Sequence, residues 1–311
     1  MTDIWRGLRD VTLRQLRTFR TVAARGNISA AARELHLTQP AVSMQLRELE
    51  DCCGVALYER AGRGIQLTEA GRELAAAAAS VLETLRGTQE RLDAMRGLQT
   101  GLLRLSVVST AKYFAPAILA AFRSGHPGVN VQLVVGNREE VVGRIADNEC
   151  DIAIMGRPPA EVRTEGCEFA PHPLVIIAAP GHPLARRKRI PFAELASEEF
   201  LVRERGSGTR TSMETLFSEQ AVTYHTSMEV SSNETIKQAV IAGMGISLIS
   251  AHTIALELAT GRLVTLDVRG LPVMRAWHAL YREGKRLSPA ATAFLSELRE
   301  RGAQLISSAL Q

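Results

Sequence analysis

Aromatic residues, cysteine and long apolar runs are all scarce in this sequence. Phe, Trp and Tyr together account for 5% of its 311 residues. The four cysteines, Cys52, Cys53, Cys150 and Cys167, show no metal-ligand spacing, and adjacent cysteines cannot easily bridge each other or face one metal ion. We therefore expect no metal and no cofactor, and reduced thiols of the kind found in cytoplasmic proteins.

The sequence also lacks a segment that could enter a membrane. The alanine run from Ala75 to Ala79 is far shorter than the ~20 residues that a transmembrane helix needs. Arginines at positions 6, 9, 14 and 17 interrupt any apolar stretch near the start, so no signal peptide is predicted. The expected location is the cytoplasm, with no membrane partner.

Lysine is absent from the first third of the chain, because none precedes Lys112. The positive charge there lies on arginine, which favours bidentate contacts with phosphate and guanine, although a GC-rich genome would produce the same bias. The formal net charge of +4 and the pI of about 9.1 permit an anionic partner without demanding one. A chain of this length is expected to hold two or three domains.

What the sequence does contain is a well-marked helix that begins at Thr38. Thr38 is a favourable N-cap, and Pro40 falls in the first helical turn, where its missing N–H costs nothing. Val42, Leu46 and Leu49 recur at helical spacing. They predict one buried stripe along this helix.

A polar row lies on the neighbouring face of the same helix. Gln39, Ser43 and Arg47 follow each other at i, i+4 and i+8. An amide, a hydroxyl and a guanidinium suit the major groove of DNA, where Gln pairs with adenine and Arg with guanine. Taken alone, such a row is more often a solvated helix face, so the flanking segments decide between the two interpretations.

The flanks favour DNA binding. Ser29–Leu35 predicts a short alanine-rich helix capped by Ser29, joined to the next helix through His36–Thr38 as in a helix-turn-helix. Leu57–Thr68 predicts two short strands around a glycine-rich, arginine-bearing tip, which is the form of a wing. The predicted DNA-contacting residues are Ser29, Thr38, Gln39, Pro40, Ser43, Gln45, Arg47, Arg60 and Arg63.

A long helix is predicted from Thr68 to about Arg96. Its apolar residues alternate spacings of four and three, which is a heptad pattern. The simpler interpretation is a helix that lies on its own domain. Because the segment joins two domains and carries charge on its outer faces, we favour a dimerising linker helix. The residues of the predicted seam are Leu74, Ala78, Val81, Leu85, Thr88, Leu92 and Met95.

Beyond Gly97–Gly101, which we interpret as a domain boundary, β and α patterns alternate. The alternation predicts βα units and a parallel sheet. Two crossovers of the chain, near Ala170–Leu174 and Leu271–Trp277, divide this segment into two similar lobes. The predicted strands are Leu102–Val108, Val129–Val135, Asp151–Met155, Leu174–Ala178, Phe200–Glu204, Met228–Ser231, Gly245–Ile249, Leu263–Val268 and Arg275–Tyr281.

Hydroxyls, glycines and cations gather directly after these strands. In open α/β sheets, ligands bind outside the carboxyl ends of the strands, where helix N-termini offer free N–H groups. An anionic, phosphate-bearing ligand would suit this set. The alternative is a series of helix caps and turns with solvated arginines, and Ser109, Thr209 and Asn233 are expected to act as caps in either case. The predicted effector-binding residues are Ser109, Thr110, Lys112, Asn137, Arg138, Arg157, Arg203, Arg205, Ser207, Thr209, Asn233, Glu234 and Thr235.

Residues that would indicate catalysis do not form a recognisable pattern. No catalytic triad, paired-carboxylate spacing or metal-ligand spacing is found, so no catalytic residue is predicted and the chain is not expected to be an enzyme. His172 and His182 each precede a proline, which predicts a turn at each position. We interpret both histidines as structural.

The N-terminal motifs resemble those of LysR-type transcriptional regulators. The resemblance implies a winged helix-turn-helix at residues 1–67, a dimerising linker helix at 68–97 and an effector domain at 98–311. The expected fold is α/β, with the effector domain two-lobed and similar to periplasmic binding proteins; lobe I covers 102–170 plus 276–305 and lobe II covers 171–275. The matching stretches are Leu16-x-x-Phe19, Ala30-Ala31-Ala32-x-x-Leu35, Thr38–Ser43, Leu46-x-x-Leu49-Glu50, Glu59-Arg60 and Leu67-Thr68-x-Ala70-Gly71.

Within that family, the chain resembles the regulators of the RuBisCO operon over nearly its whole length. This implies control of Calvin-cycle carbon-fixation genes by a phosphorylated metabolite or nucleotide bound between the lobes. It also implies a double-stranded DNA operator and a homodimer that assembles further into a tetramer. Met44 departs from the family pattern, because many members carry Arg there, and Cys52-Cys53 replaces an acidic residue and a leucine. The matching stretches are Ser109–Pro116, Gly136–Glu139, Asp151–Pro159, Gly206–Arg210 and Ser232–Val240.

Three other functions compete with this prediction. A solute-binding protein would use the same two lobes, but it would need export and would have no use for residues 1–97. An enzyme with an N-terminal helix-turn-helix would need a catalytic constellation. A LysR-type regulator of another pathway, which senses a different small anion, is the main alternative because its DNA-binding end would look the same.

Overall fold

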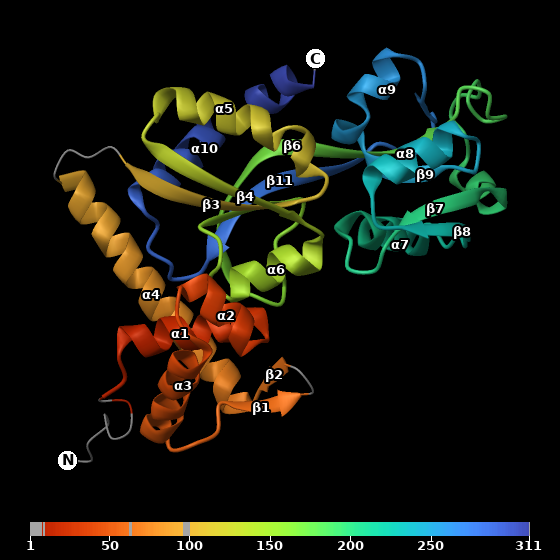
Figure 1. Cartoon of the computed structure of the whole chain (residues 1–311). Helices are drawn as coiled ribbons and strands as arrows, with labels where there is room; N and C mark the ends of the chain where they lie inside the picture. Colours follow the sequence, from red (N-terminus) through yellow and green to blue (C-terminus); the bar gives the residue numbers. More distant parts are fainter. Residues whose placement is uncertain (1–7, 9, 62–63, 96–99, 311) are drawn as a thin grey trace. The chain divides into compact units, whose positions relative to one another are not determined.

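The computed structural model describes residues 8, 10–61, 64–95 and 100–310, and the chain divides into two compact units, Met1–Leu92 and Asp93–Gln311 (Figure 1). Most of the predicted boundary segment Gly97–Gly101 lies outside the described residues. The elements of the first unit are α1 (Leu13–Arg25), α2 (Ile28–Leu35), α3 (Gln39–Cys53), β1 (Tyr58–Ala61), β2 (Gly64–Leu67) and α4 (Glu69–Met95).

Side-chain caps set where the helices of the first unit begin. Thr12 and Gln15 form a reciprocal capping box at α1. Asn27 caps α2 by accepting a backbone N–H at 3.0 Å, so the prediction of Ser29 as that cap is wrong: Asn stands two residues earlier and is as good a cap. Thr38 caps α3 as predicted.

The predicted stripe of α3 forms the core of this unit. Val42, Leu46 and Leu49 are buried together with residues of α1 and α2, and each such side chain stabilises the fold by ~1.5–3 kcal/mol. The start of α4 packs directly on the chain before the wing. A Cβ on Gly71 would lie 1.8 Å from the carbonyl oxygen of Leu57, so only glycine fits there.

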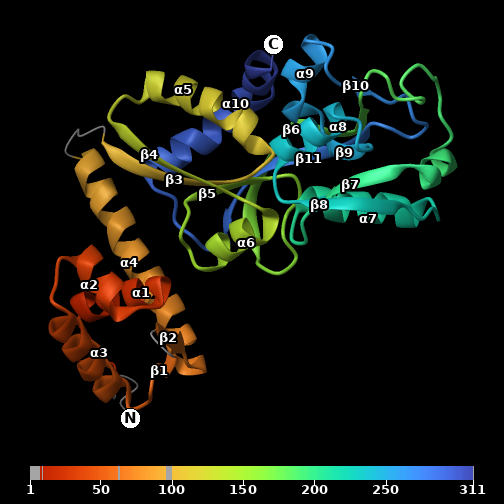
Figure 2. The same cartoon turned by 45° about the vertical axis from the view of Figure 1, so that its right-hand side comes forward.

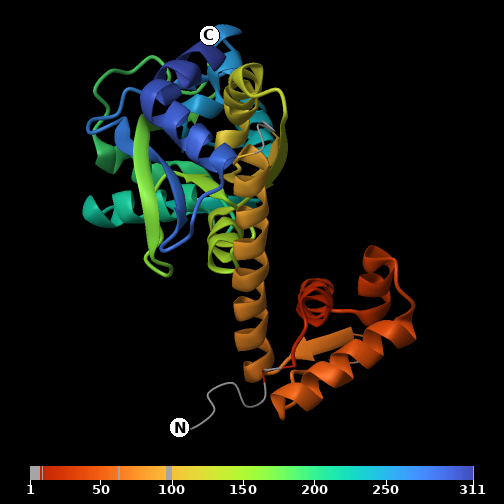
Figure 3. The same cartoon turned by 90° about the vertical axis from the view of Figure 1, so that its left-hand side faces the viewer.

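α4 is one uninterrupted helix (Figure 3). It begins after Thr68, whose hydroxyl accepts the N–H of Gly71 at 3.0 Å. The side chains of Val81, Leu85 and Leu92 are 43%, 45% and 50% exposed. Of the predicted heptad seam, Leu74 and Ala78 are therefore covered by the chain itself, whereas Val81, Leu85 and Leu92 form an exposed apolar stretch.

The second unit is built on a seven-stranded sheet with the strand order β10–β6–β11–β5–β3–β4, and β9 also pairs with β6. β7 and β8 form a separate parallel pair. Helices α5 and α10 cover one face of the sheet around β3 and β4, and α6 covers the opposite face (Figure 2). The strands are β3 (Gly101–Val108), β4 (Val129–Gly136), β5 (Ile152–Met155), β6 (Thr164–Ala178), β7 (Glu199–Arg203), β8 (His225–Val230), β9 (Ser247–Ser250), β10 (Val264–Thr265) and β11 (Val273–Arg282). The helices are α5 (Ala115–Gly125), α6 (Arg138–Ala146), α7 (Gly208–Glu219), α8 (Asn233–Ile241), α9 (Ala255–Ala259) and α10 (Pro289–Ala309). Three short 3-10 turns are η1 (Ala111–Tyr113), η2 (Phe192–Ser197) and η3 (Ala251–Thr253).

Two lobes share this unit, each with its own hydrophobic core, and β6 and β11 run through both. On β6, residues up to Ala170 pack in the core of β3, α5 and α10, whereas Leu174 packs in the core of β7 and α7. On β11 the same change falls between Val273 and Trp277. The predicted lobe boundaries, after residues 170 and 275, remain a prediction that this division supports.

The prediction of a parallel sheet is only partly right. β3 pairs in parallel with β4 and β5, but β6 and β11 run antiparallel along ten residue pairs from Val273–Leu174 to Arg282–Thr164. The first ten residues of β6 were not predicted as strand, because Gly166, Pro171 and Pro173 interrupt the sequence pattern of a buried strand. The strand tolerates them because β11 pairs with it from Thr164 to Leu174.

Candidate functional site

The polar row predicted on α3 is accessible. Gln39 and Arg47 are exposed and Ser43 is half-buried. Ser29 on α2 donates its hydroxyl to the side-chain carbonyl of Gln39 at 3.2 Å. The two helices of the motif thus place an amide, hydroxyls and a guanidinium on one exposed face. Thr38 and Pro40 are also exposed.

The wing is a two-stranded antiparallel hairpin of β1 and β2, in which Arg60 is exposed and pairs in register with Ile65. Ile65 donates its N–H to the carbonyl of Gly26 at 2.8 Å, which ties the wing to the end of α1. The predicted phosphate contact Arg63 lies outside the described residues.

Gln45 does not belong to the DNA-contacting face. Its side chain is buried, and its carbonyl oxygen accepts the hydroxyl of Thr18 on α1 at 2.7 Å. Gln45 is two residues from both Ser43 and Arg47 and so lies on roughly the opposite side of the helix, which packs against α1. The prediction that Gln45 contacts DNA is therefore wrong.

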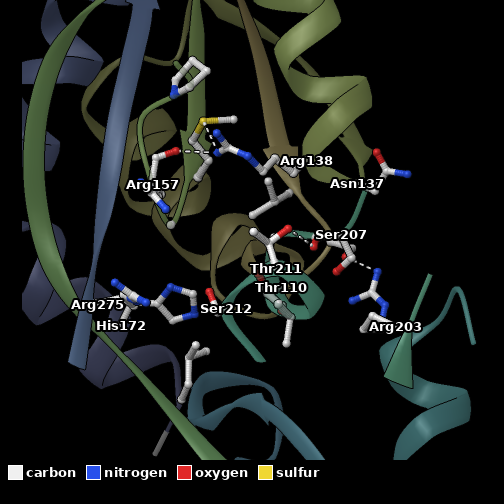
Figure 4. Close-up of a pocket in the computed structure, with 18 of the residues that line it drawn as sticks. Thr110, Asn137, Arg138, Arg157, His172, Arg203, Ser207, Thr211, Ser212 and Arg275 are labelled. Atoms are coloured by element: carbon white, nitrogen blue, oxygen red, sulfur yellow. Dashed lines mark hydrogen bonds between the residues drawn. The ribbon is translucent and has the colours of Figure 1, made fainter. Parts of the chain in front are cut away.

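A pocket of about 390 Å³ opens between the two lobes of the second unit (Figure 4). Strand ends of lobe I, the start of α7 in lobe II and the crossing strands β6 and β11 all contribute side chains. Among the predicted effector-binding residues, the pocket brings together Ser109, Thr110, Asn137, Arg138, Arg157, Arg203, Ser207 and Thr209.

The start of α7 gives this pocket an anion-binding end. Ser207 is the residue before the helix, and its side chain forms no cap bond with any described residue. The first residues of this twelve-residue helix line the pocket, and the positive end of its helix dipole favours a negatively charged ligand there. Gly208 permits close approach of a ligand to this backbone.

Arg138 lies at the start of α6 and projects into the pocket (Figure 4). It donates to the carbonyl oxygens of Arg157 at 2.7 Å and Pro158 at 3.3 Å. Partial burial lowers the pKa of its guanidinium from the ordinary value, although Glu161 opposes the shift. Arg138 thus supplies positive charge and also holds the loop that carries Arg157, whose side chain is exposed.

Arg203 is buried and its charge is already paired. Its guanidinium donates to both carboxylate oxygens of Glu204 at 2.8 and 2.9 Å. It also bonds Asn233 at 2.5 Å and reaches across to Ser109 of the other lobe at 3.1 Å. Arg203 therefore joins the lobes at the edge of the pocket rather than offering a free cation.

Comparison with known proteins agrees with this architecture. Residues 13–72 match the bacterial regulatory helix-turn-helix proteins of the lysR family, and residues 96–303 match the LysR substrate binding domain. The chain belongs to the LysR family. As in that family, it is a transcriptional regulator with a DNA-binding helix-turn-helix and not an enzyme, and the predicted fold class is confirmed.

Several relatives of this LysR-family chain have informative names. A RuBisCO operon transcriptional regulator of Allochromatium vinosum is 50% identical over 91% of this chain and 94% of its own length. The HTH-type transcriptional regulator CbbR of Rhodospirillum rubrum is 50% identical over 92% and 95%. These identities span both units of the chain.

Two solved structures bear on the two sites. The CcmR regulatory domain of Synechocystis PCC6803 in complex with 2-PG is 42% identical, with a TM-score of 0.63 over 65% of this chain and 97% of that one. Full-length CbnR complexed with its target DNA is 25% identical, with a TM-score of 0.64 over 94% and 100%.

Five predicted effector-binding residues do not line the pocket: Lys112, Arg205, Asn233, Glu234 and Thr235. Asn233 is buried against Arg203, whereas Arg205 and Thr235 are exposed. Glu234 accepts the hydroxyl of Tyr113 from the other lobe and pairs with Lys237 at 3.0 Å. Asn233, Glu234 and Thr235 follow strand β8, as the sequence predicts. The end of β8 lies outside the lining of the pocket, so these three residues do not reach it.

None of the three predicted caps, Ser109, Thr209 and Asn233, caps a helix. Asn137 caps α6 and Ser232 caps α8, each through a backbone N–H three residues later. Thr209 lies inside its helix, and Ser109 accepts Arg203 instead of capping a helix. Asn233, inside α8, is likewise no cap.

Sequence reasoning missed the pocket residues that come from the crossing strands and from the second turn of α7. These are His172 on β6, Arg275 on β11, and Thr211, Ser212 and Thr215 on α7. The helical spacing of Thr211, Ser212 and Thr215 was a usable signal. His172 and Arg275 gave none, since they lie within strands and not at strand ends.

The described residues contain no group of three His, Cys, Asp or Glu that could hold a metal ion. None of the helices that the structure describes is long and apolar enough to cross a membrane. The four cysteines are free, with Cys150 buried and the other three half-buried.

Proposed function

We propose that this LysR-family chain is a cytoplasmic regulator of carbon-fixation genes whose DNA binding responds to a phosphorylated metabolite held between the lobes of its second unit. The DNA contacts assigned to it are Ser29, Thr38, Gln39, Pro40, Ser43 and Arg47 with the wing arginines Arg60 and Arg63. The regulated genes are inferred from relatives named for the RuBisCO operon at 50% identity.

The observation that carries the effector assignment is the anion-binding end of the interlobe pocket. An uncapped helix start, Arg138, Arg157 and several hydroxyls surround one space. Phosphate bonds well to arginine forks and to helix N–H groups. The relative solved with 2-phosphoglycolate is itself a regulatory domain that aligns with this unit.

A ligand that touches both lobes stabilises the lobe angle that brings those contacts together. Its differential affinity therefore shifts the equilibrium between lobe arrangements. In an oligomer whose lobes contact one another, that shift changes how the DNA-binding units are spaced. Such coupling is worth ~1–3 kcal/mol, or a several-fold to hundredfold response.

The test compares operator binding with and without 2-phosphoglycolate in the wild type and in Arg157→Ala. We expect the variant to lose at least tenfold in ligand affinity by calorimetry, since an exposed guanidinium at the pocket is removed, while operator binding without ligand stays unchanged. Arg138→Ala should lose the response too, but it should also loosen the loop at residues 156–159. Arg262→Ala, an exposed arginine away from the pocket, is the matched control.

Unchanged affinity in Arg157→Ala and Arg138→Ala would place the effector site elsewhere. Binding of an uncharged compound or an aromatic acid in place of any phosphorylated one would favour a LysR-type regulator of another pathway.

A further inference from the structure

The interlobe pocket has a second polar side, away from the start of α7. His172, Arg275 and Ser212 lie together there, whereas Asn137, Ser207 and Arg203 lie on the other side (Figure 4). His172 and Arg275 belong to the crossing strands β6 and β11, whereas Ser212 belongs to α7, one turn beyond its start. Of the groups assigned to phosphate, the start of α7 lies on the other side, whereas Arg157 lies above His172 and Arg275 in this view (Figure 4).

His172 is the least satisfied polar side chain of the pocket. It lines the pocket with only 6% of its surface exposed, and neither ring nitrogen has a hydrogen-bond partner among the described residues. Buried polar groups in native proteins almost always have partners, and each unmet one destabilises the fold. Both nitrogens lie below the accessible surface, so a ligand reaches one of them only by packing directly against this wall of the pocket and displacing the ring slightly.

The ring cannot turn away to find another partner. It stacks on Trp277, with ring centroids 3.9 Å apart and an angle of 17°. Trp277 is fixed in turn by a hydrogen bond from its indole Nε1 to Nδ1 of His252 at 2.9 Å. On the lobe I side, a Cβ at Gly156 would lie 2.7 Å from Nδ1 of His172, so the imidazole sits directly against that glycine.

Arg275 stands directly across from His172 in the register of β6 and β11. Its Nε is buried and has no partner among the described residues. Burial, with smaller contributions from His252 and Arg275, lowers the pKa of His172 to about 3. The imidazole is therefore neutral at physiological pH and offers one N–H donor beside the permanent charge of Arg275.

We propose that His172 and Arg275 form a second subsite that receives a carboxylate of the effector, at the end of the ligand opposite its phosphate. This rests on the proposed function, which places the phosphate at the start of α7. A carboxylate can accept hydrogen bonds from the guanidinium of Arg275 and from the imidazole N–H of His172 at the same time. It is also small enough to fit beside Gly156, which packs against the imidazole. The preferred ligand class is then a short phosphorylated carboxylic acid.

The experiment compares 2-phosphoglycolate with ethyl phosphate, which has a methyl group in place of the carboxylate. Calorimetry on the full-length wild type should show 2-phosphoglycolate binding roughly 10–100-fold tighter, as expected for hydrogen bonds to a charged group. In His172→Phe, which keeps the stack on Trp277, and in Arg275→Met, that preference should fall to less than threefold while the affinity for ethyl phosphate stays within twofold. Arg262→Met serves as the control and should keep the full preference.

A measurement on the unmodified pocket covers the case in which the variants do not fold. Trp5→Phe leaves Trp277 as the only tryptophan. Because Trp277 lies against His172, 2-phosphoglycolate should change its fluorescence and ethyl phosphate should leave it unchanged. Equal responses to both ligands would count against the subsite.

The two proposals fail in different ways. Folded variants that keep the wild-type preference, or that weaken both ligands equally, overturn the carboxylate subsite and leave the phosphate site standing. A wild type that binds neither ligand overturns the proposed function and the subsite together.

Discussion

At the scale of single residues, Gln39 is the side chain most directly placed to read DNA. It is exposed at the start of α3, and Ser29 orients its amide. Gln39→Ala should weaken operator binding by about 1–3 kcal/mol and relax the preference at one base pair, because a bidentate contact with adenine is lost. Quantitative gel shifts on the operator and on its single-base variants measure both effects.

Arg60→Ala provides the contrast for Gln39→Ala. Loss of a wing contact with phosphate should weaken binding to all DNA sequences alike and reduce the salt dependence of that binding. Gln238→Ala, an exposed glutamine on α8, should change neither property. If Gln39→Ala kept its full affinity and specificity, α3 would not be the recognition helix in the orientation described.

The residues of the effector pocket differ in how far the sequence could predict them. Ser109, Asn137 and Arg157 follow strands, and the geometry of open sheets brings strand ends together. His172 and Arg275 lie within strands and face the pocket only because β6 and β11 cross between the lobes. Their alignment depends on a long-range register, which no local pattern records. The His-Pro step at residue 172 instead suggested a turn.

At the scale of secondary-structure elements, side-chain contacts join η1 of one lobe to α8 of the other, and we call these contacts the latch. The Tyr113 hydroxyl donates to Glu234, and Lys237 lies 4.9 Å from the centre of the Tyr113 ring. Lys237 also contacts Glu257 at 2.9 Å. Burial, followed by the hydrogen bond to Glu234, raises the pKa of Tyr113, so its hydroxyl remains a donor throughout the physiological range.

Removing this latch should act on every effector alike. Tyr113→Phe deletes the hydrogen bond between the lobes without touching the pocket, so less of the protein occupies the lobe angle that binds ligand. We expect the affinities for 2-phosphoglycolate and ethyl phosphate to fall by the same factor, roughly two- to thirteenfold for one hydrogen bond of ~0.5–1.5 kcal/mol. Calorimetry with both ligands measures the factor.

Tyr281→Phe is the matched control for Tyr113→Phe. Tyr281 donates to Glu165 at 3.1 Å, but its partner lies on the neighbouring strand of the same lobe. This variant should leave both affinities unchanged. A Tyr113→Phe protein with wild-type affinity for both ligands would show that the latch does not set the lobe angle.

Elements with strong local signals were predicted well, and elements held by distant pairing were not. The capping residue Thr38 and the apolar stripe of α3 are local, and both are present. β6 carries Gly166, Pro171 and Pro173 and is a strand because β11 pairs with it. The antiparallel direction of these two strands follows from the chain crossing between lobes twice, which the βα alternation alone does not reveal.

At the scale of the whole molecule, the apolar face of α4 requires a partner. Val81, Leu85 and Leu92 are large and exposed along one helix, and exposed apolar patches of this kind mark interaction sites. The heptad spacing favours a second copy of the same helix, because a two-fold coiled coil covers identical faces on both chains. The expected tetramer, built through the effector domains, remains a prediction of the family resemblance.

Charging the α4 seam should therefore separate the dimer and abolish tight operator binding in one step. In Val81→Asp with Leu85→Asp, two carboxylates per chain would have to be buried without partners, which costs far more than the contacts return. Sedimentation velocity and gel shifts on the same preparations should show the loss of the α4 dimer and a large loss of affinity together, since a palindromic operator needs two linked DNA-binding units. Ala76→Asp with Ser80→Asp adds the same charge at exposed positions off the seam and should leave assembly and binding intact. A charged-seam protein that still forms this dimer, or a monomer that binds the operator as tightly as the wild type, would contradict the assembly proposed for this regulator.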